Sequence, residues 1–181
     1  LASSSITAAS ISQVAGSVLT TFNGALNTNA VAGISLVATA ITINSTVTTT
    51  AAGPVVITNS GLLTIAAAGD MTLDGAFTQN GAGAVSTAGD ISTTNDAVSF
   101  LRAVTLTGNV AITTQTGGAG AGDITFSSTL DGAFTLGLTA GTGTITFTGA
   151  VGTTRLGAIT LTSAGTVLAS SSITAASISQ V

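Results

Sequence analysis

Apolar and polar residues alternate along this chain in short runs, which is the period-two pattern of strands with one buried face. Thr and Gly, both poor helix formers, are abundant, and no apolar stripe persists at helical spacing. Small residues interrupt the runs, for example at Gly53-Pro54 and Gly69-Asp70. The pattern predicts an all-β chain with strands at residues 41–47, 55–58, 62–65, 104–107, 110–114, 124–126, 144–148 and 159–162.

The sequence also returns to itself. Residues 1–14 read LASSSITAASISQV, and residues 168–181 repeat them without a difference, which defines a 167-residue period. We interpret residues 1–167 as one full unit of a tandem array and residues 168–181 as the start of the next unit. The alternative is a single patch duplicated at the two ends of one domain.

A shorter motif recurs inside the long period. A Leu or Phe, any residue, Gly, Ala or Asn, and an apolar residue follow one another five times, and the hexapeptide LDGAFT is identical at 73 and 130. The shared glycines, predicted to occupy structural turns, are Gly24, Gly75, Gly108, Gly132 and Gly149. Their spacings predict about nine coils of about 18 to 19 residues per period, and eight coils stay open because the frame is ambiguous around residues 89–121.

These features favour a right-handed parallel β-helix, or β-solenoid, over a sandwich. Turn motifs that recur at coil spacing are what stacking of like residues produces, and parallel crossovers are right-handed by default. Ladders of Thr, Ser and Asn hydrogen-bond where stacked charges would repel. The interior is expected to hold the apolar residues together with the aromatic ones, namely Phe22, Phe77, Phe100, Phe126, Phe134 and Phe147.

The charge inventory narrows the function. Six Asp and two Arg are the only charged residues, for a net charge of −4, and His and Cys are absent. Two separated cations form no basic patch, so we expect no nucleic-acid partner. Without His or Cys there is no soft-metal site and no Cys–His catalytic pair, and we expect no enzyme and no cofactor. Mean hydropathy is +0.71, yet polar residues break every apolar run, which predicts no transmembrane segment.

Three Gly-Asp turns make Asp70, Asp90 and Asp123 candidate calcium ligands. Residues 117–123 (GGAGAGD) approach the glycine-rich calcium roll with the Asp one place late, and the separation of Asp70 from Asp90 is close to one coil. The alternative is that Asp favours such turns because it hydrogen-bonds the backbone. Ice binding through Thr-x-Thr pairs, as at Thr144–Thr146, is a further alternative, although the pairs fall irregularly.

Three stretches carry a resemblance to a known family: LDGAFTQNGAGAVSTAGDI, GDITFSSTLDGAFTLGLTAGTGTITFTGAVG and LGAITLTSAGTV. They resemble the repeats of very large bacterial filamentous-haemagglutinin-like and autotransporter-type adhesins, and the resemblance covers essentially the whole chain. It implies secretion across the outer membrane and a right-handed β-helical rod for attachment, aggregation or sheath formation.

The sequence therefore predicts a long, rigid fibre or adhesin segment at the bacterial cell surface. Its expected partners are further copies of the repeat stacked end to end, with identical chains side by side as a second possibility. The alternative function is a subunit of a laterally assembled sheath, surface layer or multi-chain filament.

Overall fold

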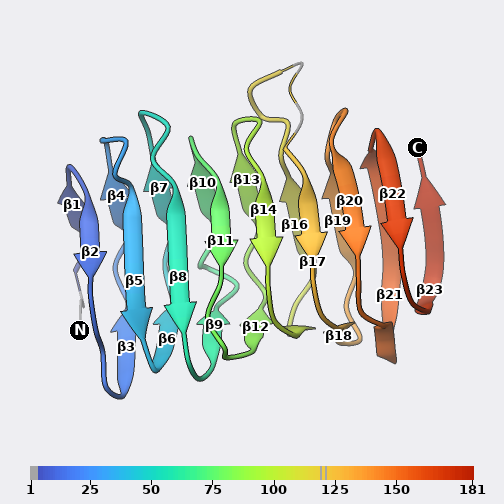
Figure 1. Ribbon diagram of the computed structural model, residues 1–181, viewed down its shortest axis with the longest axis horizontal. Helices are drawn as coiled ribbons and strands as arrows, with labels where there is room; N and C mark the ends of the chain where they lie inside the picture. The colour runs from blue at the N-terminus through green and yellow to red at the C-terminus, as the bar shows by residue number, and fades with distance from the viewer. Residues whose placement is uncertain (1–3, 119, 121) are drawn as a thin grey trace.

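The computed structural model describes residues 4–118, 120 and 122–181, and these form a parallel β-solenoid of about eight coils (Figure 1). Each coil presents three strands in succession, and strands of successive coils stack in three columns, here called face 1, face 2 and face 3. In Figure 1 the front strands run down the page while the chain advances from left to right, so the winding is right-handed. Within the described residues there is no helix.

The strands are short, and each face takes every third one. Face 1 holds β1 (Ile6–Ala8), β4 (Leu26–Thr28), β7 (Val47–Thr49), β10 (Met71–Leu73), β13 (Ile91–Thr93), β16 (Val110–Thr113) and β19 (Leu136–Thr139). Face 2 holds β2 (Ile11–Gln13), β5 (Ile34–Ala38), β8 (Val55–Asn59), β11 (Phe77–Gln79), β14 (Val98–Phe100), β17 (Ile124–Phe126), β20 (Thr144–Phe147) and β22 (Thr166–Ala169). Face 3 holds β3 (Leu19–Phe22), β6 (Ala40–Ile43), β9 (Leu63–Ile65), β12 (Val85–Thr87), β15 (Val104–Leu106) and β18 (Leu130–Asp131).

Two strands near the C-terminus run from one face to the next. β21 (Val151–Ser163) pairs with β18 of face 3 at Val151 and with β19 of face 1 at Ile159, so it rounds the corner without a break. β23 (Ile173–Gln180) follows it along the same path. Faces 1 and 3 are thereby joined into one 15-stranded sheet, and face 2 forms a separate sheet of eight strands.

Every pairing between the described strands is parallel, which confirms the predicted parallel β-helix, whereas the prediction of nine coils was wrong. Partner residues are 20 apart at Ile6 and Leu26 and 26 apart at Val98 and Ile124, so coils are longer than predicted. The spacing of the glycine motif gave a wrong number of coils because the motif occurs at all three kinds of corner. Gly24 lies between faces 3 and 1, Gly75 between faces 1 and 2, and Gly149 between faces 2 and 3. Spacings between motifs are therefore not whole numbers of coils.

The predicted strand at 41–47 is in fact two strands. β6 ends at Ile43 and β7 begins at Val47, and the corner between them is residues 44–46. Apolar alternation alone does not reveal the bend because Ile43 and Val47 both point inward, on either side of a polar corner. The reverse holds for residues 159–162, which belong to the longer strand β21.

Alternating side chains of each strand fill one continuous core. On face 2, Phe100, Phe126 and Phe147 are register partners on consecutive coils, with ring centroids 5.4 and 5.6 Å apart and nearly parallel planes. Phe77 joins the column at 5.2 Å from Phe100, and Phe22 is buried on face 3. Offset stacking of this kind adds about 0.5–1.5 kcal/mol per pair beyond area burial.

Phe134 lies outside this core, contrary to the sequence prediction. Its side chain is 39% exposed, whereas Phe77, at the same place in the hexapeptide LDGAFT, is fully buried. The first copy of the hexapeptide bends from face 1 to face 2, and Phe77 begins strand β11. The second bends from face 3 to face 1, and the next strand begins only at Leu136, which leaves Phe134 in the corner. One hexapeptide thus serves two different corners.

Candidate functional site: corner ladders and open edges

Glycines occur at corners because adjacent coils approach most closely there. A Cβ on Gly75 would lie 2.7 Å from the carbonyl oxygen of Ala52, and one on Gly108 would lie 2.8 Å from the Cβ of Ala88. Gly132 adds a second requirement, since its φ of +112° is a conformation that L side chains rarely adopt. The five motif glycines all lie at corners of the solenoid, where a side chain would collide with the coil below.

Asp70 and Asp90 lie on the corner between faces 3 and 1, on consecutive coils. An Oδ1 atom of Asp70 accepts a 2.9 Å hydrogen bond from the backbone N–H of Asp90, and Asp90 Oδ1 accepts one of 2.7 Å from Ala111. Each carboxylate thus satisfies a backbone donor of the next coil. Hydrogen bonding of Asp to the backbone was the alternative to calcium binding in the sequence analysis. The structure shows such bonds, but the backbone donor lies one coil away along the axis.

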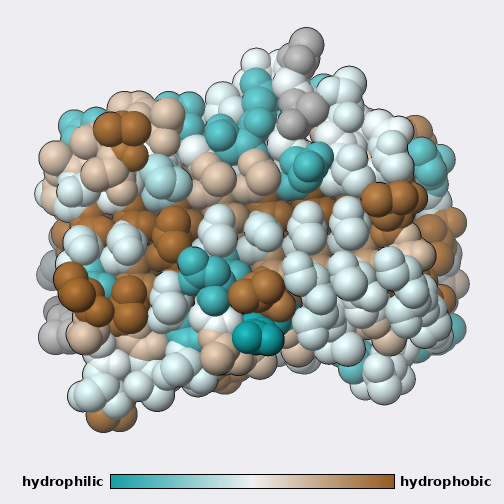
Figure 2. All heavy atoms as spheres, viewed as in Figure 1, coloured by the Kyte–Doolittle hydropathy of each residue, from teal (hydrophilic) through white to brown (hydrophobic). Residues whose placement is uncertain are grey.

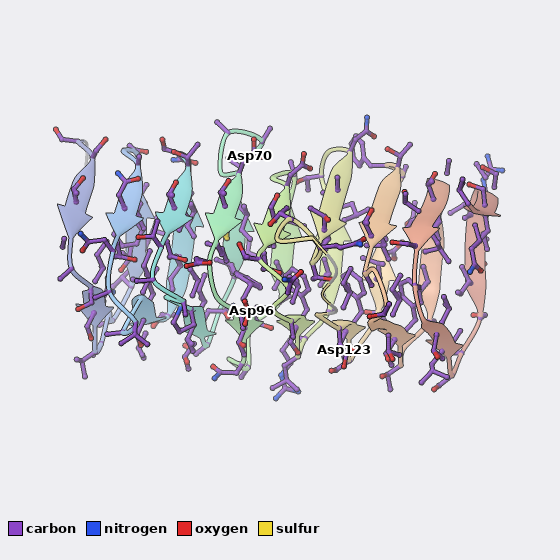
Figure 3. The ribbon with its side chains drawn as sticks, turned by 90° about the horizontal axis from the view of Figure 1, so that it is seen from above. Asp70, Asp96 and Asp123 are labelled. Atoms are coloured by element: carbon purple, nitrogen blue, oxygen red, sulfur yellow. The ribbon has the colours of Figure 1, made fainter. Side chains whose placement is uncertain are left out.

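Asp123 lies on a different corner from Asp70 and Asp90. It follows the loop between β16 and β17, on the side where faces 1 and 2 meet, and Figure 3 shows it with Asp96 away from Asp70. Its Oδ1 accepts a 2.8 Å hydrogen bond from the N–H of Thr144 on the next coil. Two residues of the preceding glycine-rich run, 119 and 121, lie outside the described residues. The structure therefore does not bring the three candidates together.

No group of three or more acidic side chains suited to a metal ion occurs among the residues that the structure describes. Asp74 and Asp131, which share the hexapeptide, lie on different corners, and each accepts hydrogen bonds from backbone N–H groups. Asp74 Oδ2 accepts from Ala52, and Asp131 Oδ1 accepts from its neighbour Gly132 and from Thr154. Calcium binding by an Asp70–Asp90 pair stays a prediction.

Asp96, at the corner between faces 1 and 2, has a raised pKa. Partial burial raises the pKa of its carboxyl above the ordinary value, and the negative charge of Asp74, on the preceding coil of the same corner, raises that pKa further. The ionised form of Asp96 is therefore disfavoured in the folded chain. This corner carries a built-in electrostatic cost at neutral pH.

A buried network of polar side chains lies at the corner between faces 2 and 3. Gln79 and Asn59 are both fully buried at the ends of β11 and β8, and Gln79 Nε2 donates a 2.7 Å hydrogen bond to Asn59 Oδ1. Asn59 Nδ2 donates in turn to the carbonyl of Gly61 at 2.6 Å. Gln79 Oε1 accepts from the backbone N–H groups of Leu101 and Arg102 at 3.2 and 3.3 Å. These contacts tie three consecutive coils together.

Inward-pointing threonines at the end of face 1 hold the corner loops. Thr49 donates a 2.5 Å hydrogen bond to the carbonyl of Gly53, and Thr114 donates one of 2.6 Å to that of Gly122. Thr93 does the same with the carbonyl of Asp96. Neither these threonines nor Gln79 were among the residues that the sequence pattern singled out. The signal was available, because each follows a buried apolar residue by two positions, as Thr49 follows Val47.

The two ends of the solenoid are open edges. Within the described part of the chain, β1, β2 and β3 at one end and β22 and β23 at the other pair with a strand on one side only. Large apolar side chains are exposed there, and brown apolar groups are visible towards both ends in Figure 2. They are Val14, Val18 and Leu19 at the first end and Leu168, Ile178 and Val181 at the second. Unpaired strands with apolar flanks are templates for further strand pairing.

The sides of the rod carry shallow grooves. One runs along face 1 past Asp90, Asn109 and Ala111, and another lies near Thr39, Asn59 and Arg102. In the second groove, the Nε of Arg102 donates a 3.2 Å hydrogen bond to the backbone carbonyl of Gly81. Neither groove brings two carboxylates together.

Comparison with known proteins yields no match to this chain, whether among family models, curated proteins or solved structures. Among the residues described, no helix has the length and apolarity needed to cross a membrane. The class that the fold of the described residues defines is a parallel β-solenoid.

Proposed function

We propose that this chain is a segment of a structural extracellular fibre or adhesin, in which tandem 167-residue units form one long, rigid rod at a bacterial surface. The observation that carries the proposal is the pair of open edges at the ends of an all-parallel ladder, together with the identical 14-residue segments found near both ends. A parallel ladder such as that of the described residues can be continued by another coil, and the repeat supplies its sequence.

Rigidity follows from the ladder and the corners. Each interior strand is hydrogen-bonded to a strand on both sides, and the corner aspartates, threonines and the Gln79 network add contacts between coils. Stretching the rod or cutting it with a protease requires several of these contacts to break together. With coils about 4.8 Å apart, one unit of slightly under eight coils adds about 37 Å of length.

The alternative, a sheath or multi-chain filament built by lateral packing, is favoured by a separate observation. Four large apolar side chains are exposed on the flanks and not at the ends: Val31, Leu62, Leu101 and Phe134. Many outward side chains between them are Thr and Ser, and Figure 2 shows a pale, weakly polar surface over β17, β20 and β22 of face 2. Such flanks can pack against identical flanks with little charge repulsion.

Electron microscopy of chains with one, two and three tandem units tests the proposal. We expect rods whose length rises by about 37 Å per added unit at constant width. A compact particle whose length does not grow with the number of units would contradict the rod. Mass per unit length separates the two forms: one chain per cross-section supports the stalk or adhesin, and several chains support lateral assembly.

A further inference from the structure

The two copies of the repeated 14-residue segment lie on different faces. In the first copy, Ile6 pairs with Leu26 on face 1 and Ile11 pairs with Ile34 on face 2. In the second copy, the equivalent Ile173 pairs with Val151 on face 3, and Ile178 pairs with Ile159 on face 1. Both copies round a corner between their two isoleucines, with a break between Ala8 and Ile11 in the first copy and within the unbroken strand β23, between Ile173 and Ile178, in the second. The segment is thus used alike, but one face earlier in the coil.

The offset means that one period is not a whole number of coils. Counting β21 as two strand positions because it occupies faces 3 and 1, the chain advances 23 positions from Ile6 to Ile173. At three positions per coil this is seven coils and two further faces. The next unit therefore begins rotated by one face relative to the one before it.

Coil length excludes the whole-number alternatives. Residues in direct register with Ile6 lead through Leu26, Val47, Met71, Ile91, Ile112 and Leu138 to Leu161. A period of eight coils would place Ile173 directly over Leu161, leaving a final coil little more than half as long as the others. A period of seven would place it over Leu138, with a final coil far longer than any observed. Paired residues throughout the described ladder are 19 to 26 apart, as at Ile159 and Ile178 for the lower value and at Val104 and Leu130 for the upper.

We propose that the open edge formed by β22 and β23 binds the next copy of this repeat in a register that rotates each unit by one face. This inference rests on the proposed tandem fibre. Both halves of the junction are present in the structure: residues 173–180 pair with β21 below, and the same sequence at residues 6–13 pairs with β4 and β5 above. If residues 173–180 pair upward as residues 6–13 do, the ladder continues and the next coil covers Ile178, which is 55% exposed here.

The rotation has a consequence for the fibre surface. A side chain on one face of the first unit appears on each of the other faces in the next two units and returns after three. Three units contain 23 coils, or about 110 Å of rod. Any feature of one unit, such as the exposed corner at Phe134, is therefore displayed on all sides of the fibre in turn.

Engineered disulfides in the 181-residue chain test the placement of the second copy. Thr160 and Ser179 are register partners, and neighbouring strands place such Cα atoms within disulfide range. We expect T160C/S179C to cross-link under oxidation and T162C/T174C, the pair that eight whole coils would bring together, to stay reduced. The pair T125C/T146C, register partners on face 2, is the positive control. Peptide mass spectrometry without reduction gives the yields.

Efficient cross-linking of T162C/T174C would overturn the rotated register, and so would failure of T160C/S179C while the control forms. In either case the solenoid and the proposed function survive. Failure of the face 2 control as well would refute the ladder itself, and the proposed fibre with it.

A chain of three tandem units provides the second test. With Thr125 of every unit changed to Cys and labelled with gold, electron microscopy should show successive labels on different sides of the rod. Labels in a single line along one side would overturn the rotation and leave the rod intact.

Discussion

Gln79 donates a 2.7 Å hydrogen bond from its side-chain amide to Asn59, and both side chains are fully buried in the corner between faces 2 and 3. Their partners are carbonyls and N–H groups of three successive coils. An interior filled mainly by Ile, Val, Leu and Phe thus contains a Gln79–Asn59 pair whose side-chain polar atoms are all hydrogen-bonded. Such a network fixes the register of the coils, because a shift by one residue would leave all its members unpaired.

Gln79→Leu is expected to destabilise the chain by about 2–4 kcal/mol. The substitution leaves Asn59 Oδ1 without its donor and the N–H of Arg102 without that acceptor, whereas the N–H of Leu101 keeps its hydrogen bond to the backbone carbonyl of residue 79. Each buried polar group left unpaired costs about 1–3 kcal/mol. Chemical denaturation measures the loss. Thr78→Val, on the outward side of the same strand, is the matched control and should change stability by less than about 0.5 kcal/mol. Equal effects of the two substitutions would contradict a structural role for the network.

Phe126→Ala is expected to cost about 3–5 kcal/mol, because Phe126 is stacked between Phe100 and Phe147 in a closely packed core. Phe134→Ala should cost far less, since that ring is 39% exposed in a corner. The two variants remove the same atoms, so the difference in their denaturation midpoints reports burial alone. A comparable loss for Phe134→Ala would show that this ring is covered, for instance by a neighbouring chain.

Thr49 and Thr28 are register partners on face 1 and allow a matched test of the inward threonines. The Thr49 hydroxyl donates to the carbonyl of Gly53 and accepts from the N–H of Asp74. Thr49→Val should therefore cost about 1–3 kcal/mol, and Thr49→Ser, which keeps the hydroxyl, should cost less. Within the described chain the buried hydroxyl of Thr28 has no hydrogen-bond partner, so Thr28→Val is expected to be neutral or stabilising. Thermal unfolding of the three variants measures these differences in stability. A large loss of stability for Thr28→Val would contradict the assignment.

The raised pKa of Asp96 should make the stability of the folded chain depend on pH. Its pKa is raised in the folded chain by burial and by Asp74, so the folded state binds the proton more tightly than the unfolded state. Between the ordinary pKa and the raised one, the free energy of unfolding therefore falls as pH rises. At neutral pH the ionised carboxylate destabilises the fold, and Asp96→Asn should be more stable than the parent chain.

That advantage should vanish at a pH below both pKa values, where Asp96 is protonated in either state. Denaturation midpoints measured from pH 7 down to acid conditions give the profile. Asp74→Asn should weaken the dependence, because it removes the second cause of the shift while an amide oxygen can still accept from Ala52. An Asp96→Asn variant that loses stability at neutral pH would contradict the assignment.

Because the corner aspartates accept backbone hydrogen bonds, we expect their substitution to change stability differently from the substitution of metal ligands. Asp90→Asn keeps an oxygen acceptor for the N–H of Ala111 and should preserve stability, whereas Asp90→Ala should cost about 1 kcal/mol. Added calcium should leave the melting temperature of the parent chain unchanged. A rise in melting temperature with calcium that Asp90→Asn abolishes would instead establish an Asp70–Asp90 calcium site.

Several features of this protein were determined by the sequence alone. Alternation of apolar residues with Thr and Ser specified strands with one buried face, because strand side chains point to opposite sides with a period of two. The spacing of small residues specified frequent corners. The 14-residue identity specified that the sequence returns to itself after 167 residues. These are local properties, readable from neighbours in the chain or from a direct match between its ends.

Tertiary structure alone decided which corner each motif occupies. The hexapeptide LDGAFT buries Phe77 at one corner and exposes Phe134 at another, and the repeated segment lies on faces 1 and 2 in one copy and on faces 3 and 1 in the other. The physical reason is that the face on which a residue lies depends on the summed length of all preceding coils. Single coils differ in length, as the unequal separations of Ile6 from Leu26 and of Val98 from Ile124 show. Only the stacked backbone, pairing coil with coil, fixes that sum.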